Sequence, residues 1–557
     1  MKKGLLRLIS MVVVFSTVHV QAAEYTDFKN AFWLYRWSVL DGLVREESDN
    51  ASSVTTENCS ISIDSGDVIK QIDGKYLGVH ILNSDYYDMK NNCLTENYRG
   101  IADKIYGIPL FRCGSAGNAL DALKLPRERG VSYILPDIGY EKYNPGIDYS
   151  ATGLDLNEQP QVPEDIIAAL ANNPNAEFIF NIDIRRTYPS QTVQFMHFCT
   201  DPNGSSDMAR LREAWGIPGP VKVIGLEMSN ELYFMDTGYW TDEAQMSSAV
   251  NWYIDVCKKH ADALAESFPD TKIIPCIDGM PVRNGSSVQF NAWNKPVIEK
   301  LAPYIDLVAV HRYYSMSDTY TRVALDCDEI MSMIRATGKD IKIALTEHST
   351  WDVDSSVTKA PIKRQSLAAM LDVMKFMCDI LQKDEIYCAN YHNFSDSVGW
   401  GMIHTGNGTK GKMVLSAIEK AYAMLSDNYG SCVVSRSVTK GSVHTDMSNA
   451  KNELACVVMG SDDGTLKVML VNDSTERRYS IDFSLDSKYT LVKKDIITAP
   501  NKYSFIYGDE AADLFERETE TYRGSGEFVQ YTVPTKSFVI LTLKKTAKVS
   551  NERKRAS

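Results

Sequence analysis

Two glutamates, Glu231 and Glu347, stand out because each lies at the end of a short apolar run that is typical of a buried strand. The first run leads into EMSNE (227–231) and the second into LTEH (345–348). Two carboxyl groups about 5 to 5.5 Å apart can cleave a glycosidic bond with retention, since one protonates the leaving oxygen while the other attacks the anomeric carbon. We therefore expect Glu231 to act as general acid/base and Glu347 as nucleophile.

Polar neighbours of the two glutamates fit this chemistry. Asn230 can hydrogen-bond a sugar 2-hydroxyl, a contact that strengthens as charge develops at the anomeric carbon. Arg112 and Tyr313 each lie at or just beyond the end of another apolar run. A cation and a hydroxyl donor next to a carboxylate keep it ionised and oriented. We expect Arg112 and Tyr313 to do this for Glu347.

The elements that must position these residues follow one rhythm between residues 76 and 395: a short apolar run, a polar loop, then a helix-like stretch. The candidate strands are 76–82, 108–113, 177–183, 221–226, 272–277, 305–310, 341–346 and 385–391. Eight β/α units close a barrel whose active site lies at the carboxyl ends of the strands. The tips of the fourth and seventh strands then face each other across the mouth. An open doubly wound sheet is the alternative, but the first strand-to-helix turns lack the G-x-G-x-x-G pattern that would support it.

The rest of the chain divides around this α/β barrel, which we assign to residues 76–425. Residues 1–22 have a basic start, an apolar run and a small-residue end, and they predict a cleaved signal peptide and a secreted or periplasmic protein. Residues 23–57 form an N-terminal extension. Period-two strands at 426–545 predict a β-sandwich, which the strand-like segment 58–75 is expected to join. Residues 546–557 form a basic tail.

Composition and missing motifs exclude several classes of function. The formal net charge of -13 argues against nucleic acid and anionic membranes as partners. The N-terminal apolar run is shorter than the roughly 20 residues of a spanning helix, so we expect no membrane insertion. The eleven cysteines form no CxxC pairs and no cluster has metal-ligand spacing, so we expect neither a metal nor a cofactor. A G-x-S-x-G elbow of the esterase type is absent from the sequence.

Taken together, these residues resemble the large clan of retaining glycosidases on (β/α)8 barrels, whose acid/base glutamate follows an asparagine on strand four and whose nucleophile ends strand seven. EMSNE (227–231) is similar to the E-x-G-N-E motif of the α-L-arabinofuranosidase family and of the neighbouring β-glucuronidase and heparanase-like family, with Ser229 in place of the usual glycine. RCGSAGN (112–118) resembles the R-x-x-G-G-N stretch after strand two, and HRYY (311–314) resembles the H-x-Y stretch after strand six.

The resemblance implies a site that holds an oligosaccharide or polysaccharide. By this likeness Glu227, Asn118 and His311 line the subsite of the cleaved sugar, and Trp400 in a glycine-flanked loop after strand eight is a candidate substrate contact. The closest likeness predicts an α-L-arabinofuranosidase acting on plant-type polysaccharide. A β-glucuronidase, a β-xylosidase or an endo-glycanase would use the same carboxylates, and a carbohydrate-binding protein without turnover is the alternative of another class. Whether His348 faces the site or the helix layer is open.

Overall fold

The computed structural model describes residues 53–81, 87–88, 93–94, 107–114, 170–171, 173–184, 187–214, 216–233, 243–279, 288–314, 327–350, 366–396, 401–404, 414–440, 443–444, 453–499, 515–524 and 526–546. The predicted signal peptide, most of the N-terminal extension and nearly all of the basic tail lie outside these ranges.

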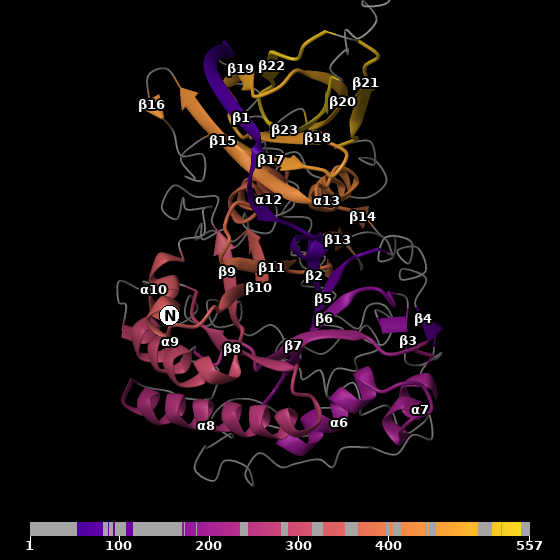
Figure 1. Ribbon diagram of the computed structural model, residues 1–557, viewed down its shortest axis with the longest axis vertical. Helices are drawn as coiled ribbons and strands as arrows, with labels where there is room; N and C mark the ends of the chain where they lie inside the picture. Colours follow the sequence, from indigo (N-terminus) through magenta and orange to yellow (C-terminus); the bar gives the residue numbers. More distant parts are fainter. Residues whose placement is uncertain are drawn as a thin grey trace, which may run out of the picture.

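Eight parallel strands close into a barrel in chain order, as the sequence predicts (Figure 1). They are β2 (Gly78–Ile81), β5 (Leu110–Cys113), β6 (Glu177–Ile182), β7 (Lys222–Met228), β8 (Lys272–Ile277), β9 (Leu307–Tyr314), β10 (Lys342–Thr350) and β11 (Ile386–Tyr391). The ring closes where β11 pairs with β2. The open-sheet alternative is therefore wrong.

The first barrel strand starts two residues later than predicted. Residues Gly74–Leu77 form a 3-10 helix (η1) instead, and the Asp73 carboxylate caps it by accepting a 3.0 Å hydrogen bond from the Lys75 backbone nitrogen. The apolar side chains of Tyr76 and Leu77 are buried in this turn, so burial alone does not distinguish it from a strand in the sequence.

Helices surround the barrel, and apolar side chains between the two layers form its core. The described helices are α6 (Pro189–Thr200), α7 (Asp207–Ala214), α8 (Glu243–Ser267), α9 (Val288–Leu301), η7 (Ala302–Tyr304), α10 (Asp328–Ala336), α12 (Leu367–Ile380) and α13 (Ala417–Asp427). Short strands beside the barrel are β3 (Tyr87–Asp88), β4 (Cys93–Leu94), β12 (Ser395–Asp396), β13 (Ile403–His404) and β14 (Val414–Leu415). Among the described residues, no helix combines the length and apolarity that crossing a membrane requires.

The second domain is a mixed sheet built mostly from the C-terminal part of the chain. Its strands are β1 (Thr55–Gln71), β15 (Cys432–Lys440), β16 (Val443–His444), β17 (Leu454–Gly460), β18 (Thr465–Asn472), β19 (Arg477–Leu485), β20 (Tyr489–Thr498), β21 (Glu518–Thr521), β22 (Gln530–Val533) and β23 (Ser537–Lys545). Strands β21-β20-β23-β18-β17 form one leaf and β15-β1-β19-β22 the other. Only two residue pairs of β15 and β17 join the leaves, and apolar side chains from both leaves form a common core, so the sheet folds over itself like a sandwich.

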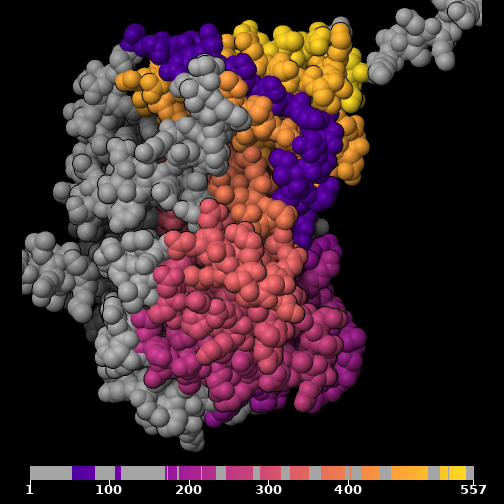
Figure 2. Space-filling model, turned by 60° about the vertical axis from the view of Figure 1, so that its left-hand side comes forward, coloured from indigo at the N-terminus to yellow at the C-terminus, as the bar shows by residue number. Residues whose placement is uncertain are grey.

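The N-terminal strand β1 belongs to this second domain, although more than 350 residues separate it from its neighbours. It pairs antiparallel with β15 and parallel with β19. Figure 2 shows its indigo residues lying along the orange and yellow strands and continuing toward the barrel. The strand begins at Thr55, three residues before the predicted segment 58–75.

Helix α12 attaches the second domain to the barrel. Every residue of it except Asp372 is buried, because barrel strand β10 lies against one side and β17, β18 and β23 lie against the other. A helix that carries apolar side chains on most of its surface is stable in such a buried position. The Lys375 ammonium is satisfied by the Asp473 carboxylate of the sheet at 2.7 Å. The barrel and the sheet therefore share one apolar core on this side.

Candidate active site

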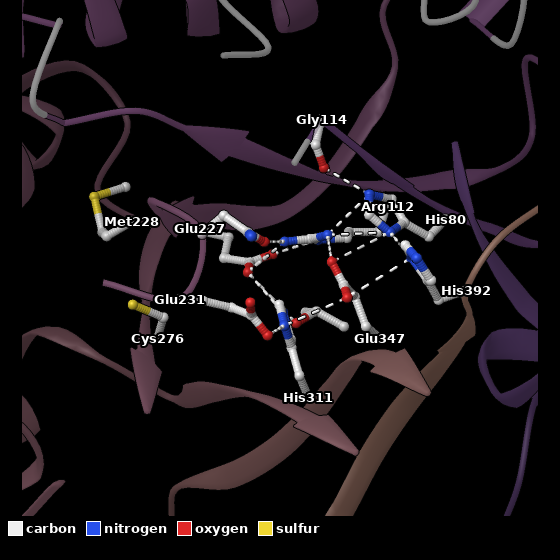
Figure 3. A network of polar contacts seen from close by, with 12 residues as sticks. His80, Arg112, Gly114, Glu227, Met228, Glu231, Cys276, His311, Glu347 and His392 are labelled. Carbon is white, nitrogen blue, oxygen red and sulfur yellow. Dashed lines mark hydrogen bonds and ion pairs between the residues drawn. The ribbon is translucent and has the colours of Figure 1, made fainter. Parts of the chain in front are cut away.

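Glu231 and Glu347 lie next to each other at the mouth of the barrel. Glu231 is the third residue after the end of β7, and Glu347 lies within β10. A carboxylate oxygen of Glu231 lies within 4.8 Å of one of Glu347, and Figure 3 shows both side chains pointing into the same space. Oxygens this close fit the roughly 5 to 5.5 Å between the carboxyl groups of retaining glycosidases rather than the roughly 6.5 to 9.5 Å of inverting ones.

A strained turn after β7 directs Glu231 into this space. Ser229 and Glu231 both adopt left-handed backbone angles, with φ of 65° and 52°. Such a conformation costs roughly 1–2 kcal/mol for a residue other than glycine. Hydrogen bonds to the neighbouring strand offset this cost, since the Ser229 backbone nitrogen donates to Ile182 and its hydroxyl accepts from the Ile184 backbone nitrogen at 2.9 Å. Serine thus takes the place of the glycine in the related motif by anchoring the turn with its side chain.

A β-bulge in β10 directs Glu347. Leu345 pairs with Val310 of β9, but Glu347 pairs with the very next residue of β9, His311. Thr346 is therefore an extra residue, and the strict alternation of faces is lost at this point. As a result the Thr346 hydroxyl approaches Glu227 inside the barrel while the adjacent Glu347 also points inward, toward Arg112.

Arg112, on β5, holds the side chains around it in place through hydrogen bonds. Its guanidinium donates two 2.7 Å hydrogen bonds to Glu227, one of 2.5 Å to Glu347 and one of 2.8 Å to the Asn230 side-chain oxygen. Arg112 and Glu227 are both completely buried. Their hydrogen bonds lie within this cluster, as expected for a cation that orients Glu347, and the expectation that Glu227 lines the sugar subsite stays a prediction.

The surroundings of Glu347 keep it ionised. Burial alone would raise the pKa of Glu347, but the positive charge of His311, together with that of Arg112, holds this pKa well below its usual value. The Tyr313 hydroxyl donates a short hydrogen bond to the second carboxylate oxygen. Burial, and then the charge of Glu347, raise the pKa of Tyr313 well above its usual value, so this donor keeps its proton. A buried, oriented and ionised carboxylate is the form that a nucleophile requires.

His311 joins the two glutamates. Its Nδ1 lies 2.8 Å from a Glu231 oxygen and 3.5 Å from a Glu347 oxygen, and its Nε2 lies 3.5 Å from Glu227. Burial would lower the pKa of His311, but Glu347, Glu227 and Glu231 outweigh it and raise this pKa to about 10. The ring is therefore a cation that holds the carboxylates together. The Tyr233 hydroxyl also contacts Glu231, at 3.2 Å.

Two histidines of the site were missed in the sequence, His80 on β2 and His392 just after β11. The His80 Nδ1 lies 2.9 Å from the His392 Nδ1 and 3.4 Å from a Glu347 oxygen, and the His392 Nδ1 lies 3.7 Å from the other oxygen of Glu347. Burial lowers the pKa of His392 to about 4 and that of His80 well below its usual value, so both rings are neutral at pH 7. A polar residue inside the short apolar run GVHI (78–81) was the available signal for His80.

His348, whose orientation was open, faces the helix layer. Its two ring nitrogens lie 3.3 Å from the hydroxyls of Tyr314 and Tyr422, and its ring packs against Phe376 of α12. Burial lowers the pKa of His348 to about 3. This histidine therefore belongs to the packing behind β10. The other two candidates, Asn118 and Trp400, lie outside the described residues.

Two groups of side chains within the described residues have the spacing to hold a metal ion. One is His80, Glu347 and His392, and the other is Glu231, His311 and Glu347. Both groups include Glu347. A metal in either group would therefore compete with the carboxylate chemistry rather than assist it.

Comparisons with known proteins agree with this architecture. The sequence matches no protein-family model and no curated protein. Among solved structures, the fold is similar to a thermostable GH51 α-L-arabinofuranosidase from Thermotoga petrophila, with a TM-score of 0.64 and 18% identity over 87% of this chain and 100% of the other. For a family 51 α-L-arabinofuranosidase from Bifidobacterium longum the TM-score is 0.65 and the sequence identity 14%, over 88% of this chain and 99% of the other. For a family 44 xyloglucanase from Paenibacillus polymyxa the TM-score is 0.52 and the sequence identity 12%, over 88% of this chain and 100% of the other. The predicted likeness in fold, a (β/α)8 barrel with an accessory β domain, is confirmed.

Proposed function

We propose that this protein is a retaining glycoside hydrolase with Glu347 as nucleophile and Glu231 as general acid/base. One observation carries the proposal: the two carboxylates, from β10 and from the end of β7, lie within 4.8 Å of each other at the barrel mouth. The fold shared with several glycosidases supports it. The hydrogen bonds to Glu347 from Arg112 and Tyr313 fit a carboxylate that must stay charged and aimed.

The reaction proceeds in two displacements. Glu347 attacks the anomeric carbon while Glu231 transfers its proton to the leaving oxygen, so the glycosidic bond breaks and a glycosyl ester on Glu347 forms. Glu231, now a carboxylate, then removes a proton from water. The water oxygen bonds to the anomeric carbon, the ester bond breaks, and both glutamates return to their starting states with the configuration retained.

Asn230 is placed to bind the sugar 2-hydroxyl. Its side-chain oxygen accepts from Arg112, which fixes the orientation of the amide. The amide nitrogen is therefore turned away from Arg112 and can donate toward the sugar. Because Asn230 is only partly buried, this donor is within reach of a ligand in the mouth.

For the substrate we propose an α-L-arabinofuranosyl group on plant-type polysaccharide. Two observations support this substrate: several of the solved structures with a similar fold are α-L-arabinofuranosidases, and the EMSNE motif resembles the motif of that family. We also propose that the protein acts outside the cytoplasm, in the periplasm or as a secreted enzyme, because residues 1–22 have the pattern of a cleaved signal.

A panel of aryl glycosides tests the proposal. Purified protein is incubated with aryl α-L-arabinofuranoside, β-xyloside and β-glucuronide, and the first-formed anomer of the released sugar is followed by NMR. We expect hydrolysis of the arabinofuranoside with retention. Hydrolysis of the glucuronide or xyloside alone contradicts the arabinose assignment, and first-formed inverted product contradicts double displacement. If the protein binds oligosaccharides saturably but hydrolyses none of the aryl glycosides, it is a carbohydrate-binding protein rather than an enzyme.

A further inference from the structure

We propose that His80, His392 and Glu347 also form a binding site for one divalent transition metal ion, Zn²⁺ in particular, which reversibly blocks the nucleophile. The binding itself follows from the geometry of the three side chains. Its inhibitory consequence rests on the proposed function of Glu347.

The distances among the three side chains suit zinc. The two histidine Nδ1 atoms lie 2.9 Å apart, and they lie 3.4 and 3.7 Å from the nearer oxygens of Glu347. Zinc bonds of about 2.0 to 2.1 Å place tetrahedral ligands about 3.3 to 3.4 Å apart. A shift of a few tenths of an ångström in each side chain therefore brings two imidazoles and one carboxylate to the same ion. Two histidines with one glutamate is a recurring ligand set of zinc sites that keep a fourth position open.

A hydrogen bond already sets His80 for metal binding. Its Nε2 lies 2.6 Å from the backbone carbonyl oxygen of Gly114, as Figure 3 shows. A carbonyl only accepts, so the contact with Gly114 favours the tautomer with its proton on Nε2, in which the Nδ1 lone pair is free to bind an ion; the Arg112 terminal nitrogen lies near both ring nitrogens, 2.8 Å from Nε2 and 3.1 Å from Nδ1. A backbone carbonyl on the far nitrogen is the usual partner that fixes the tautomer of a metal-binding histidine.

The site is enclosed but reachable. The side chains of His80 and Glu347 are 0% and 6% exposed, whereas that of His392 is 14% exposed, so solvent touches the site at His392. The second group, Glu231, His311 and Glu347, is the poorer site. Both ring nitrogens of His311 already face carboxylates, Nδ1 toward Glu231 at 2.8 Å and Nε2 toward Glu227 at 3.5 Å.

Arg112 limits the affinity of the site. One of its terminal nitrogens lies 2.5 Å from Glu347 and 3.1 Å from the His80 Nδ1, so the guanidinium competes with the ion for the same two atoms. Zinc must displace these contacts and tolerate a nearby positive charge. We therefore expect reversible binding that is weaker than at a structural zinc site and that a chelator abolishes.

Equilibrium dialysis against zinc chloride in a non-chelating buffer tests the site directly, with no need for turnover. Wild-type protein should retain one zinc per chain. His392→Ala, which removes one ligand, should weaken binding by at least about tenfold, the lower end of the loss seen when only a second-shell partner is removed. Glu347→Gln, which keeps the volume but loses the charge, should weaken it as well, and circular dichroism checks that both variants are folded.

The matched control is His197→Ala. His197 lies on α6 with its Nδ1 3.0 Å from the Asp201 carboxylate, so it is also a histidine beside an acid, but on the surface. This variant should bind zinc like the wild type. No zinc retained by the wild type, or equal retention by His392→Ala, overturns the site. Zinc that binds as expected without inhibiting an active enzyme overturns the blocking role, whereas absence of turnover without zinc counts against the proposed function alone.

Discussion

Replacing Arg112 with methionine is expected to lower the free energy of unfolding by about 3–5 kcal/mol, because breaking a buried ion pair by removing one partner leaves an uncompensated charge. The contacts of Arg112 explain why a loss of this magnitude is expected. Arg112 is completely buried and donates four hydrogen bonds of 2.5 to 2.8 Å, three of which go to carboxylates. Arg112→Lys keeps the charge but not the two-pronged contact with Glu227. It should cost about 1.5–3 kcal/mol, equivalent to one charge-assisted hydrogen bond.

The loss of unfolding free energy in Arg112→Met should depend on pH in a defined direction. In the wild type, burial opposes ionisation of Glu227 and Glu347, but Arg112 acts on both and His311 acts most strongly on Glu347, so both pKa values are lowered. A carboxylate with a lowered pKa stabilises the fold above its unfolded value, near 4.3, and this contribution disappears as the pH falls through the folded value. The difference between wild type and Arg112→Met should therefore be largest at neutral pH and should shrink below about pH 4.

Urea denaturation at several pH values measures this difference, and the pH profile of kcat/KM provides a second readout. Without Arg112 the pKa of Glu347 rises, so the acidic limb of the profile should move to higher pH in Arg112→Met and less in Arg112→Lys. A methionine variant within about 1 kcal/mol of wild type at pH 7, with an unshifted acidic limb, would refute the reasoning, since it falls outside the range for a buried pair.

Three further substitutions separate the roles of neighbouring residues. Glu231→Ala should lower kcat by about 10²- to 10⁴-fold, and azide should restore deglycosylation because a small anion attacks without base assistance; no rescue would point to another acid/base. Tyr313→Phe should lower kcat/KM roughly tenfold to 100-fold through loss of one hydrogen bond to the Glu347 carboxylate, and unchanged steady-state kinetics would contradict this. His348→Phe should lower the free energy of unfolding by about 1–3 kcal/mol while kcat/KM stays near wild type; a large loss of activity in the folded variant would place His348 in the site.

The parts of the site that could be predicted are those that depend on chain order and strand ends. Glu231 follows one apolar run and Glu347 ends another, and in a closed parallel barrel the ends of all strands meet at one rim. Arg112 and Tyr313 were found by the same argument, and the structure places both against Glu347. The eight strands were found because a parallel strand buried on both faces leaves a continuous apolar run.

What could not be predicted depends on register and on contacts between distant segments. His80 lies in the middle of a strand of four residues, where only the pairing with β5 decides that its ring faces Arg112. The bulge at Thr346 changes which face of β10 points inward, and no residue type marks it in the sequence. The burial of Glu227 under Arg112 follows from the same three-dimensional arrangement. Likewise, the sequence suggests that β1 joins the second domain but does not specify β15 and β19 as its partners.

The central claim is that Glu347 forms a covalent bond to the sugar. The direct measurement is to trap this bond with a 2-fluoro glycoside of the preferred sugar that carries a good leaving group, and then to locate the label by peptide mass spectrometry. The account predicts one sugar per chain on the peptide that contains Glu347, and no label in Glu347→Gln. A label on another carboxylate, or full turnover of the substrate by Glu347→Gln, would contradict it.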